Sequence, residues 1–136
     1  TRLDVYDPNP PHAGLLQKLM KWWDRQGIKA QTQVMLHDDQ IAGTADIVPL
    51  GAVWDLKCTY NLEASYEAQL GAYGHLALNV MAGNDVRRRG QFFKMPDLAI
   101  IHVTARFPEP RLIEIDAERA IDDWLAIRRV FEIGRR

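Results

Sequence analysis

Apolar residues recur at two different spacings along the chain, and these spacings predict which segments are helices and which are strands. Near the beginning of the sequence they fall at steps of three and four, at Leu15, Leu16, Leu19, Met20, Trp22 and Trp23. This period is typical of one face of a helix. We therefore predict a helix over about residues 12–26, closed by Gly27 as its carboxyl-terminal cap. At least two of Trp22, Trp23 and Trp54 are expected in the core.

Two further helices are predicted from the same period of three and four. The first is expected from an N-cap at Asn61 to about Asn79. The other is expected over residues 117–133, with Asp116 as its N-cap. Glycine and proline punctuate residues 80–96, which therefore read as a loop.

Five short segments between these helices have the character of strands. Residues 30–37, 41–50 and 53–59 are separated only by turn signals, which predicts an antiparallel meander. Two more strands are expected at residues 98–105 and 112–115. The order is then helix, three strands, helix, two strands, helix. It predicts an α/β fold with a central mixed β-sheet flanked by helices.

Length and composition favour one soluble globular unit spanning residues 1–136. The chain has 136 residues, of which 47% are hydrophobic and 26% are charged. It has no apolar run near the ~20 residues that a membrane-spanning helix needs. Cys58 is the single cysteine, which excludes an internal disulfide framework and suits a cytoplasmic location in a bacterium or phage-infected cell. We expect Cys58 to be a small core residue.

Net charge is −1, so nothing global drives the chain towards nucleic acid, and a DNA-binding hypothesis rests on local patches. The most suggestive patch is the basic run Arg87, Arg88 and Arg89, followed by two phenylalanines and Lys94. A loop with basic and aromatic side chains can hold a DNA strand. A solvated loop without that role remains the alternative.

The candidate chemistry begins with two acids. Asp46 and Asp55 lie nine positions apart, on the second and third strands of the predicted meander. The turn between those strands would fold one onto the other and place the carboxylates side by side. Two close carboxylates repel each other, and a shared divalent cation is the usual resolution. Mg²⁺ needs few protein ligands because it retains several waters.

Lys57 belongs to the same predicted site. It lies two positions after Asp55 on one strand, so both side chains point to the same face. Its ammonium can stabilise a hydroxide or the charge that develops on a phosphate. The Leu56 side chain points the opposite way, into the core, while its backbone carbonyl can still reach a metal. A plain Asp55–Lys57 ion pair on an exposed strand is the alternative.

Three segments together resemble the motifs of the PD-(D/E)XK nuclease superfamily, in particular its RecB-like, phage-type exonuclease branch. They are Gly43-Thr44-Ala45-Asp46, Asp55-Leu56-Lys57 and Gln69-Leu70-Gly71-Ala72-Tyr73. They occur in the family's order and at compatible spacing. Gln69 and Tyr73 are four apart and share one helical face. Taken singly, Gln69 could be a solvated helix residue and Tyr73 a core aromatic.

The resemblance implies a restriction-endonuclease-like fold and Mg²⁺- or Mn²⁺-dependent hydrolysis of phosphodiester bonds. A DNA exonuclease of phage or bacterial recombination or repair is the leading expectation, acting alone, as a homo-oligomer or with a recombination partner protein. The residues carried over are Asp46, Asp55, Lys57, Gln69 and Tyr73 as catalytic, and Asp46, Asp55 and the Leu56 carbonyl as metal ligands.

One departure from the family pattern leaves a second hypothesis open. Many members carry a further acid or histidine in the first helix or first strand. Here the strand offers Gln31 and Gln33, and the helix offers His12 and Asp24. Glutamines are poor metal ligands, so the chain could instead be a nuclease-fold module with a degraded site that serves as a DNA-binding or assembly subunit.

Overall fold

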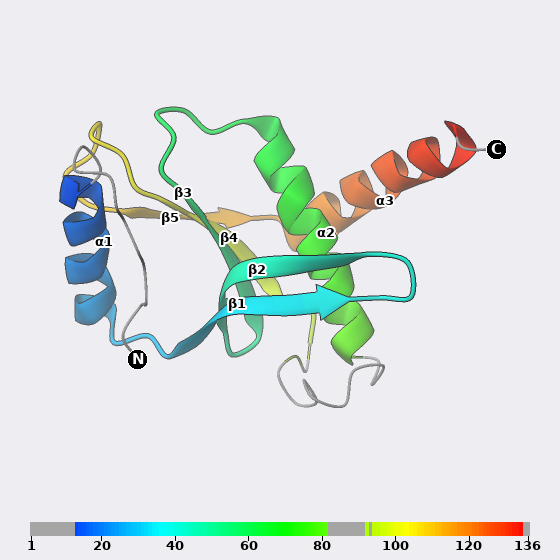
Figure 1. The fold of residues 1–136 in the computed structure, drawn as a ribbon, viewed down its shortest axis with the longest axis horizontal. Helices are drawn as coiled ribbons and strands as arrows, with labels where there is room; N and C mark the ends of the chain where they lie inside the picture. The colour runs from blue at the N-terminus through cyan, green and yellow to red at the C-terminus, as the bar shows by residue number, and fades with distance from the viewer. Residues whose placement is uncertain (1–12, 82–91, 93, 135–136) are drawn as a thin grey trace.

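The computed structural model describes residues 13–81, 92 and 94–134, and its elements follow the predicted order (Figure 1). The elements are α1 (Ala13–Gln26), β1 (Ala30–His37), β2 (Ala42–Pro49), β3 (Ala52–Lys57), α2 (Ala64–Met81), β4 (Asp97–His102), β5 (Arg111–Ile115) and α3 (Ala117–Gly134). In the part of the chain that is described, no helix combines the length and apolarity needed to cross a membrane. Most of the predicted loop at residues 80–96 lies outside the described residues.

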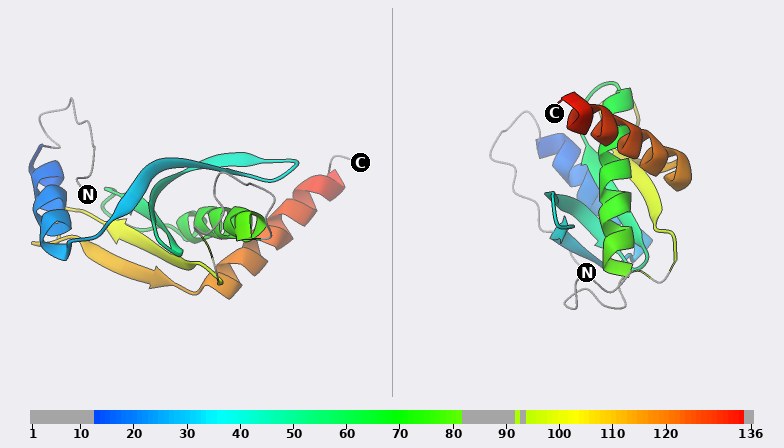
Figure 2. Two further views of the ribbon diagram at one scale, coloured as in Figure 1. Left: turned by 90° about the horizontal axis from the view of Figure 1, so that it is seen from below. Right: turned by 90° about the vertical axis from the view of Figure 1, so that its right-hand side faces the viewer.

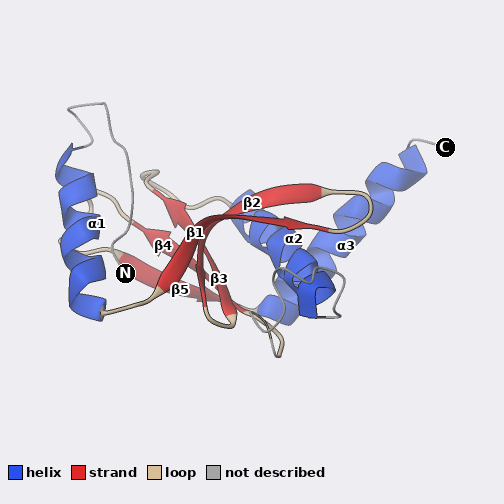
Figure 3. Ribbon diagram, turned by 60° about the horizontal axis from the view of Figure 1, so that its bottom comes forward, coloured by secondary structure: helices blue, strands red, loops and turns tan. Residues whose placement is uncertain are grey.

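The five strands form one sheet in the order β1-β2-β3-β4-β5 (Figure 3). Neighbouring strands are antiparallel, except that β3 and β4 are parallel. A parallel pair needs a crossover connection, and α2 lies in the segment that joins β3 to β4. The meander of the first three strands and the mixed α/β sheet are both confirmed.

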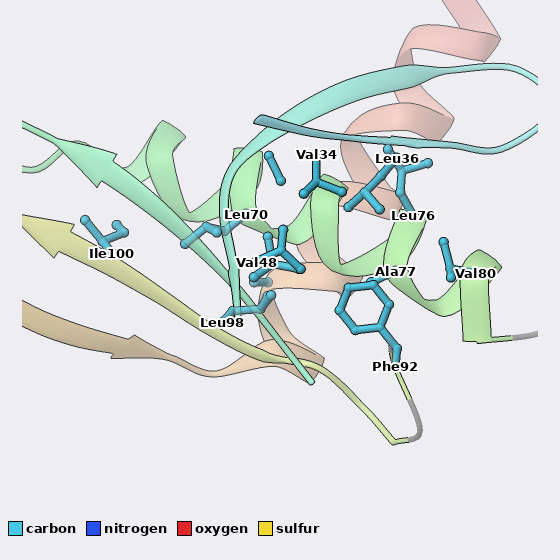
Figure 4. Packing of buried hydrophobic residues seen from close by; sticks show 13 residues of the cluster. Val34, Leu36, Val48, Leu70, Leu76, Ala77, Val80, Phe92, Leu98 and Ile100 are labelled. Carbon is cyan, nitrogen blue, oxygen red and sulfur yellow. The ribbon is translucent and has the colours of Figure 1, made fainter. Parts of the chain in front are cut away.

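Helices cover both faces of the sheet. On one face, Leu70, Leu76 and other residues of α2 pack with strand residues such as Val34, Val48 and Leu98 (Figure 4). On the opposite face, α1 buries Trp22 and Trp23 against strand residues of a second cluster. The predicted burial of at least two tryptophans is therefore confirmed. Figure 2 shows α2 between the β1–β2 hairpin and α3.

The β1–β2 hairpin changes face part-way along its length. Ala45 packs in the α2 cluster and Ile47 in the α1 cluster, although strict alternation would place both on one face. Asp46 lies between them, opposite Gln33, and the pair interrupts an otherwise continuous register. Gln33 has a φ of 52°, in the left-handed region that side chains rarely adopt. This local irregularity lets Ala45 and Val48 both face α2.

Two local predictions after β3 are wrong. The strand ends at Lys57, and the next helix begins only at Ala64. Cys58 lies beyond the last strand residue and is exposed, so it is not a core residue. Helix α2 begins at Ala64, so Asn61 does not cap it. Instead the Asn61 side-chain oxygen accepts a hydrogen bond from Arg106 at 2.9 Å. The Glu63 carbonyl accepts from the first-turn amide of Tyr66.

Helix α3 begins as predicted and packs closely on α2. The Asp116 carboxylate accepts a hydrogen bond from the Arg119 amide at 3.1 Å, which confirms the N-cap. A Cβ added at Gly71 of α2 would lie only 1.9 Å from the backbone oxygen of Ala120. Glycine therefore sets how closely the two helices approach.

A partly buried ion pair ties the β1–β2 turn to α3. Arg128 lies 2.9 Å from the Asp38 carboxylate, and both side chains are largely covered. Burial raises the pKa of Asp38, but hydrogen bonds from the amides of Ile41 and Gln40 and the Arg128 guanidinium outweigh it. The pKa of Asp38 therefore lies well below its ordinary value.

We expect Gly71→Ala to lower the free energy of unfolding by about 1–3 kcal/mol, because backbone must move to admit the methyl group. The loss should appear in urea denaturation although alanine favours helix formation by roughly 1 kcal/mol. Gly74→Ala is the matched control, since its Cβ would meet only side-chain atoms, of Ile121 and Leu98 at 3.1 Å, and no backbone atom that close. Equal stability of the Gly71→Ala variant and the wild type would contradict the close approach.

Asp38→Asn is expected to lower the free energy of unfolding at pH 7 by about 1–2 kcal/mol, because it removes the negative charge that lies 2.9 Å from Arg128. The folded pKa of Asp38 is depressed, so the pair contributes fully above the unfolded value of 3.8 and loses its contribution as the pH falls towards the folded value. The difference from wild type should therefore shrink between pH 5 and about pH 2. The exposed neighbour variant Asp39→Asn should show no such trend; a pH-independent difference for Asp38→Asn would refute the assignment.

Candidate active site

The register of β2 and β3 brings the two predicted acids together. Ile47 pairs with Trp54, which places Asp46 opposite Asp55 one step further along the antiparallel ladder. Ile47 and Trp54 both belong to the cluster on the α1 face. Their neighbours Asp46 and Asp55 face α2 instead, and the Lys57 ammonium beside Asp55 contacts Gln69 of that helix.

Asp46 is held by the next strand. Its Oδ2 accepts a hydrogen bond from the backbone amide of Leu56 at 3.0 Å. The Leu56 side chain packs with the α1 cluster, as predicted, so the strand turns its apolar side chain away from the acids. The role of the Leu56 carbonyl as a metal ligand remains a prediction.

Asp55 is the more buried of the two acids, with 3% of its surface exposed. Burial and the adjoining Asp46 carboxyl raise the pKa of Asp55 to about 7, against the opposing influence of Lys57. The pKa of Asp55 is raised because both a low-dielectric environment and a neighbouring negative charge disfavour the ionised carboxylate. The Asp46–Asp55 pair therefore favours binding a proton or a cation.

The Lys57 ammonium stands between the acid pair and α2. Its Nζ lies 3.0 Å from Asp55 Oδ2 and donates to Gln69 Oε1 at 3.1 Å. It also lies 4.5 Å from the centre of the Tyr66 ring, in a cation–π arrangement. The Lys57 side chain is 20% exposed, so solvent reaches it although its ammonium contacts three partners.

Gln69 and Tyr73 extend this network along α2. Gln69 Nε2 lies 3.4 Å from the Tyr73 hydroxyl. The Tyr73 ring is partly buried against the core, and burial raises the pKa of its phenol. A Cβ at Gly43 would come within 2.8 Å of Tyr73 Cε1, so the glycine of the first motif makes room for this ring. The structure thus brings the three predicted motifs into one place.

The donor set fits a small hard cation with few protein ligands. Asp55 Oδ2 is buried without a hydrogen-bond partner among the described residues, and the Lys57 ammonium lies 3.0 Å from it as an ion-pair partner. Asp46 presents a second carboxylate beside it. No group of three metal-ligating side chains occurs within the described ranges. Two carboxylates with water completing the shell suit Mg²⁺ or Mn²⁺.

Of the other predicted contact residues, only Lys94 and Asp24 can be placed relative to this site. Arg87, Arg88 and Arg89 lie outside the described residues. Lys94 is exposed before the beginning of β4, whereas Lys57 ends the parallel strand β3, so the two lysines lie near opposite ends of that strand pair. Their contact with nucleic acid remains a prediction. Asp24 is exposed on α1, which covers the other face of the sheet.

Sequence reasoning missed Tyr66 as a member of the site. Its hydroxyl lies 3.5 Å from Thr59 Oγ1, and its ring faces the Lys57 ammonium. The available signal was its spacing, three residues before Gln69 and seven before Tyr73, which keeps all three on one helical face.

Comparison with known proteins supports the fold. No protein-family model matches the chain, and no curated protein matches it. Among solved structures, the chain is similar to one from Eubacterium rectale named "Putative exonuclease", with a TM-score of 0.58 and 14% sequence identity. The match covers 90% of this chain and 53% of the other, so the chain spans about half of that protein's length. At this identity the likeness shows a shared α/β fold.

The contact between Gly43 and Tyr73 can be tested by a double-mutant cycle. Gly43→Ala should destabilise the wild-type chain by about 1–2 kcal/mol, because the new methyl group would displace the Tyr73 ring. In a Tyr73→Ala background the same change should cost much less, since the ring is gone. Urea denaturation of the four proteins measures the coupling. An equal cost in both backgrounds would show that the ring and the glycine do not touch.

Proposed function

We propose that this chain is a Mg²⁺- or Mn²⁺-dependent nuclease of the PD-(D/E)XK type that hydrolyses phosphodiester bonds of DNA. Its action as an exonuclease in bacterial or phage recombination or repair is part of the same proposal. The observation that carries it is the adjoining acid pair Asp46 and Asp55, in which Asp55 is buried and the Lys57 ammonium lies 3.0 Å from its Oδ2. The fold shared with a protein named as an exonuclease is in keeping with it.

Asp46 and Asp55 would hold the cation, together with the Leu56 carbonyl. When bound, the cation would supply a Lewis acid for the phosphate and lower the pKa of water. The neighbouring side chains have separate tasks. Lys57 places a positive charge beside the acids, where negative charge develops on the phosphate oxygens. Gln69, which accepts from Lys57, keeps that ammonium aimed at the acids and has an amide group for the substrate.

Tyr73 acts through Gln69 rather than on the acids directly. Its hydroxyl is within 3.4 Å of the Gln69 amide nitrogen, and its ring is wedged against Gly43. A fixed ring holds the amide in one orientation, so that the amide oxygen stays with Lys57. Tyr73 is therefore a positioning residue in this proposal.

A DNA-binding or assembly module without hydrolytic activity is the second candidate. One observation favours it, which is that no third acid or histidine joins Asp46 and Asp55 within the described residues. The Lys57 ammonium already lies against Asp55 and could balance its charge. The two candidates differ in cleavage and in the response to metal.

The decisive experiment follows linear DNA labelled at either end, single- or double-stranded, in Mg²⁺, Mn²⁺ or EDTA. Cleavage should need the metal, and Asp55→Asn or Lys57→Ala should reduce its rate at least about a hundred-fold. Mg²⁺ or Mn²⁺ should raise the midpoint of thermal unfolding of the wild type but not of Asp55→Asn. The label lost first gives the polarity.

Asp24→Asn is the matched control, because Asp24 is an exposed acid on the helix that covers the other sheet face. It should keep full activity and the metal-induced shift. DNA binding without cleavage under any metal would support the second candidate. A cleavage rate unchanged by Asp55→Asn would place the active site elsewhere.

A further inference from the structure

A cluster of aromatic and basic side chains lies at the end of the sheet where β3 and β4 finish. Tyr60, in the loop after β3, has an exposed fraction of 65%. The Arg106 guanidinium lies 4.7 Å from the Tyr60 ring centre and 5.3 Å from that of Phe107. Arg111, the first residue of β5, has its guanidinium 4.5 Å from the centre of the Phe107 ring. Two guanidinium groups and two rings thus form one surface.

The backbone of the Tyr60 loop is anchored independently of the Tyr60 ring. Arg106 donates to the Tyr60 carbonyl at 3.4 Å and to Asn61 Oδ1 at 2.9 Å. The buried His102 ring lies 2.6 Å from the Thr59 carbonyl oxygen, which fixes the residue before. Neither contact uses the Tyr60 side chain. Because the backbone is held, the ring is displayed in a fixed place at little entropic cost.

A short chain of contacts joins this surface to the candidate active site. Thr59 lies next to Tyr60 and 3.5 Å from the Tyr66 hydroxyl. The Tyr66 ring in turn faces the Lys57 ammonium at 4.5 Å. The carboxyl ends of the parallel strands β3 and β4 open onto the same edge. A chain molecule bound at Lys57 could therefore continue over Tyr60.

The charge of the surface selects the kind of ligand. Arg106 and Arg111 have no carboxylate within ion-pairing distance among the described residues, whereas Arg25 pairs with Glu109 near the same turn. An unpaired guanidinium favours phosphate, and a flat exposed ring favours the face of a base. A duplex keeps its bases stacked on each other, so only an unpaired base can lie on Tyr60.

We propose that Tyr60 and Arg106 form a stacking site for an unpaired base of single-stranded nucleic acid, next to the scissile phosphate. The inference rests on the proposed nuclease function and specifies its substrate. The Tyr60 ring takes the base, and the guanidinium groups of Arg106 and Arg111 take the flanking phosphates. Single-stranded ends are therefore preferred to blunt duplex ends.

Binding of a dye-labelled single-stranded oligonucleotide and of its blunt duplex, measured by anisotropy in EDTA, tests the site without cleavage. Tyr60→Ala should weaken binding of the single strand on the order of ten-fold, because the base loses its stacking partner. Tyr60→Phe should restore it. Binding of the duplex should change little in either variant. Equal single-strand affinity of the wild type and Tyr60→Ala would overturn the proposal.

Phe131→Ala is the matched control, since that ring is 63% exposed on α3. It should leave binding unchanged, which separates stacking from a general loss of exposed aromatic surface. A series of oligonucleotides with a single abasic position adds a second test. The wild type should lose affinity at one position, and Tyr60→Ala should be indifferent to that same position. Uniform behaviour of both proteins along the series would also overturn the site.

The oligonucleotide-binding experiment tests the Tyr60 site independently of the cleavage experiment. Tyr60-dependent binding without metal-dependent cleavage would retain this site and reject the nuclease. Cleavage that needs Asp55 while binding ignores Tyr60 would retain the nuclease and reject this site. Circular dichroism melting of Tyr60→Ala should match the wild type, because the loop contacts of Arg106 are made to the backbone and to Asn61.

Discussion

Two carboxylates enclosed between a sheet and a helix repel each other, and much of the molecule is arranged around that repulsion. Asp46 is satisfied by the Leu56 amide, but Asp55 Oδ2 is buried with no hydrogen bond from the described residues. Because its pKa is raised, the folded chain holds the Asp55 proton more tightly than the unfolded chain does. Ionising Asp55 as the pH rises through neutrality therefore costs stability. A bound cation would return that stability, which is why the same acids destabilise the free fold and favour the proposed metal-bound one.

The strands accommodate this pair through one irregularity. Gln33 adopts a φ of 52° opposite Asp46, and there the hairpin changes which residues face α2. Strained backbone persists where the surroundings determine it, and here both sides are packed, by α2 on one face and α1 on the other. With strict alternation, Ala45 and Asp46 could not both face α2. The irregularity thus lets one strand supply an apolar contact and a carboxylate to the same helix.

Sequence patterns correctly predicted which residues are neighbours within regular strands and helices. They failed where the backbone departs from the regular repeat. Alternation in β2 and β3 put Asp46 beside Asp55, and helical spacing put Gln69 with Tyr73, because each relation spans one or two regular elements. Cys58 was misplaced since nothing local showed that β3 ends at Lys57, two residues before the predicted end of the strand. The face change at Gln33 has no sequence signature, as a positive φ is favoured by glycine or asparagine, not glutamine. The Lys57–Tyr66 and Tyr60–Arg106 contacts join segments that meet only in three dimensions, so no local pattern predicts the contacts themselves.

Helix α2 links the stability of the fold to the geometry of the site. Gly71 lies midway between Gln69 and Tyr73 and faces α3, where it approaches the Ala120 backbone. The distance between α2 and α3 therefore determines how close Gln69 lies to Lys57. The opposite side of the helix has its own spacer, since Gly43 sets how closely the Tyr73 ring can lie against β2. Two glycines on different elements thus fix the helix from both sides. The 3.1 Å contact of Gln69 with Lys57 is a consequence of helix packing as much as of the motif itself.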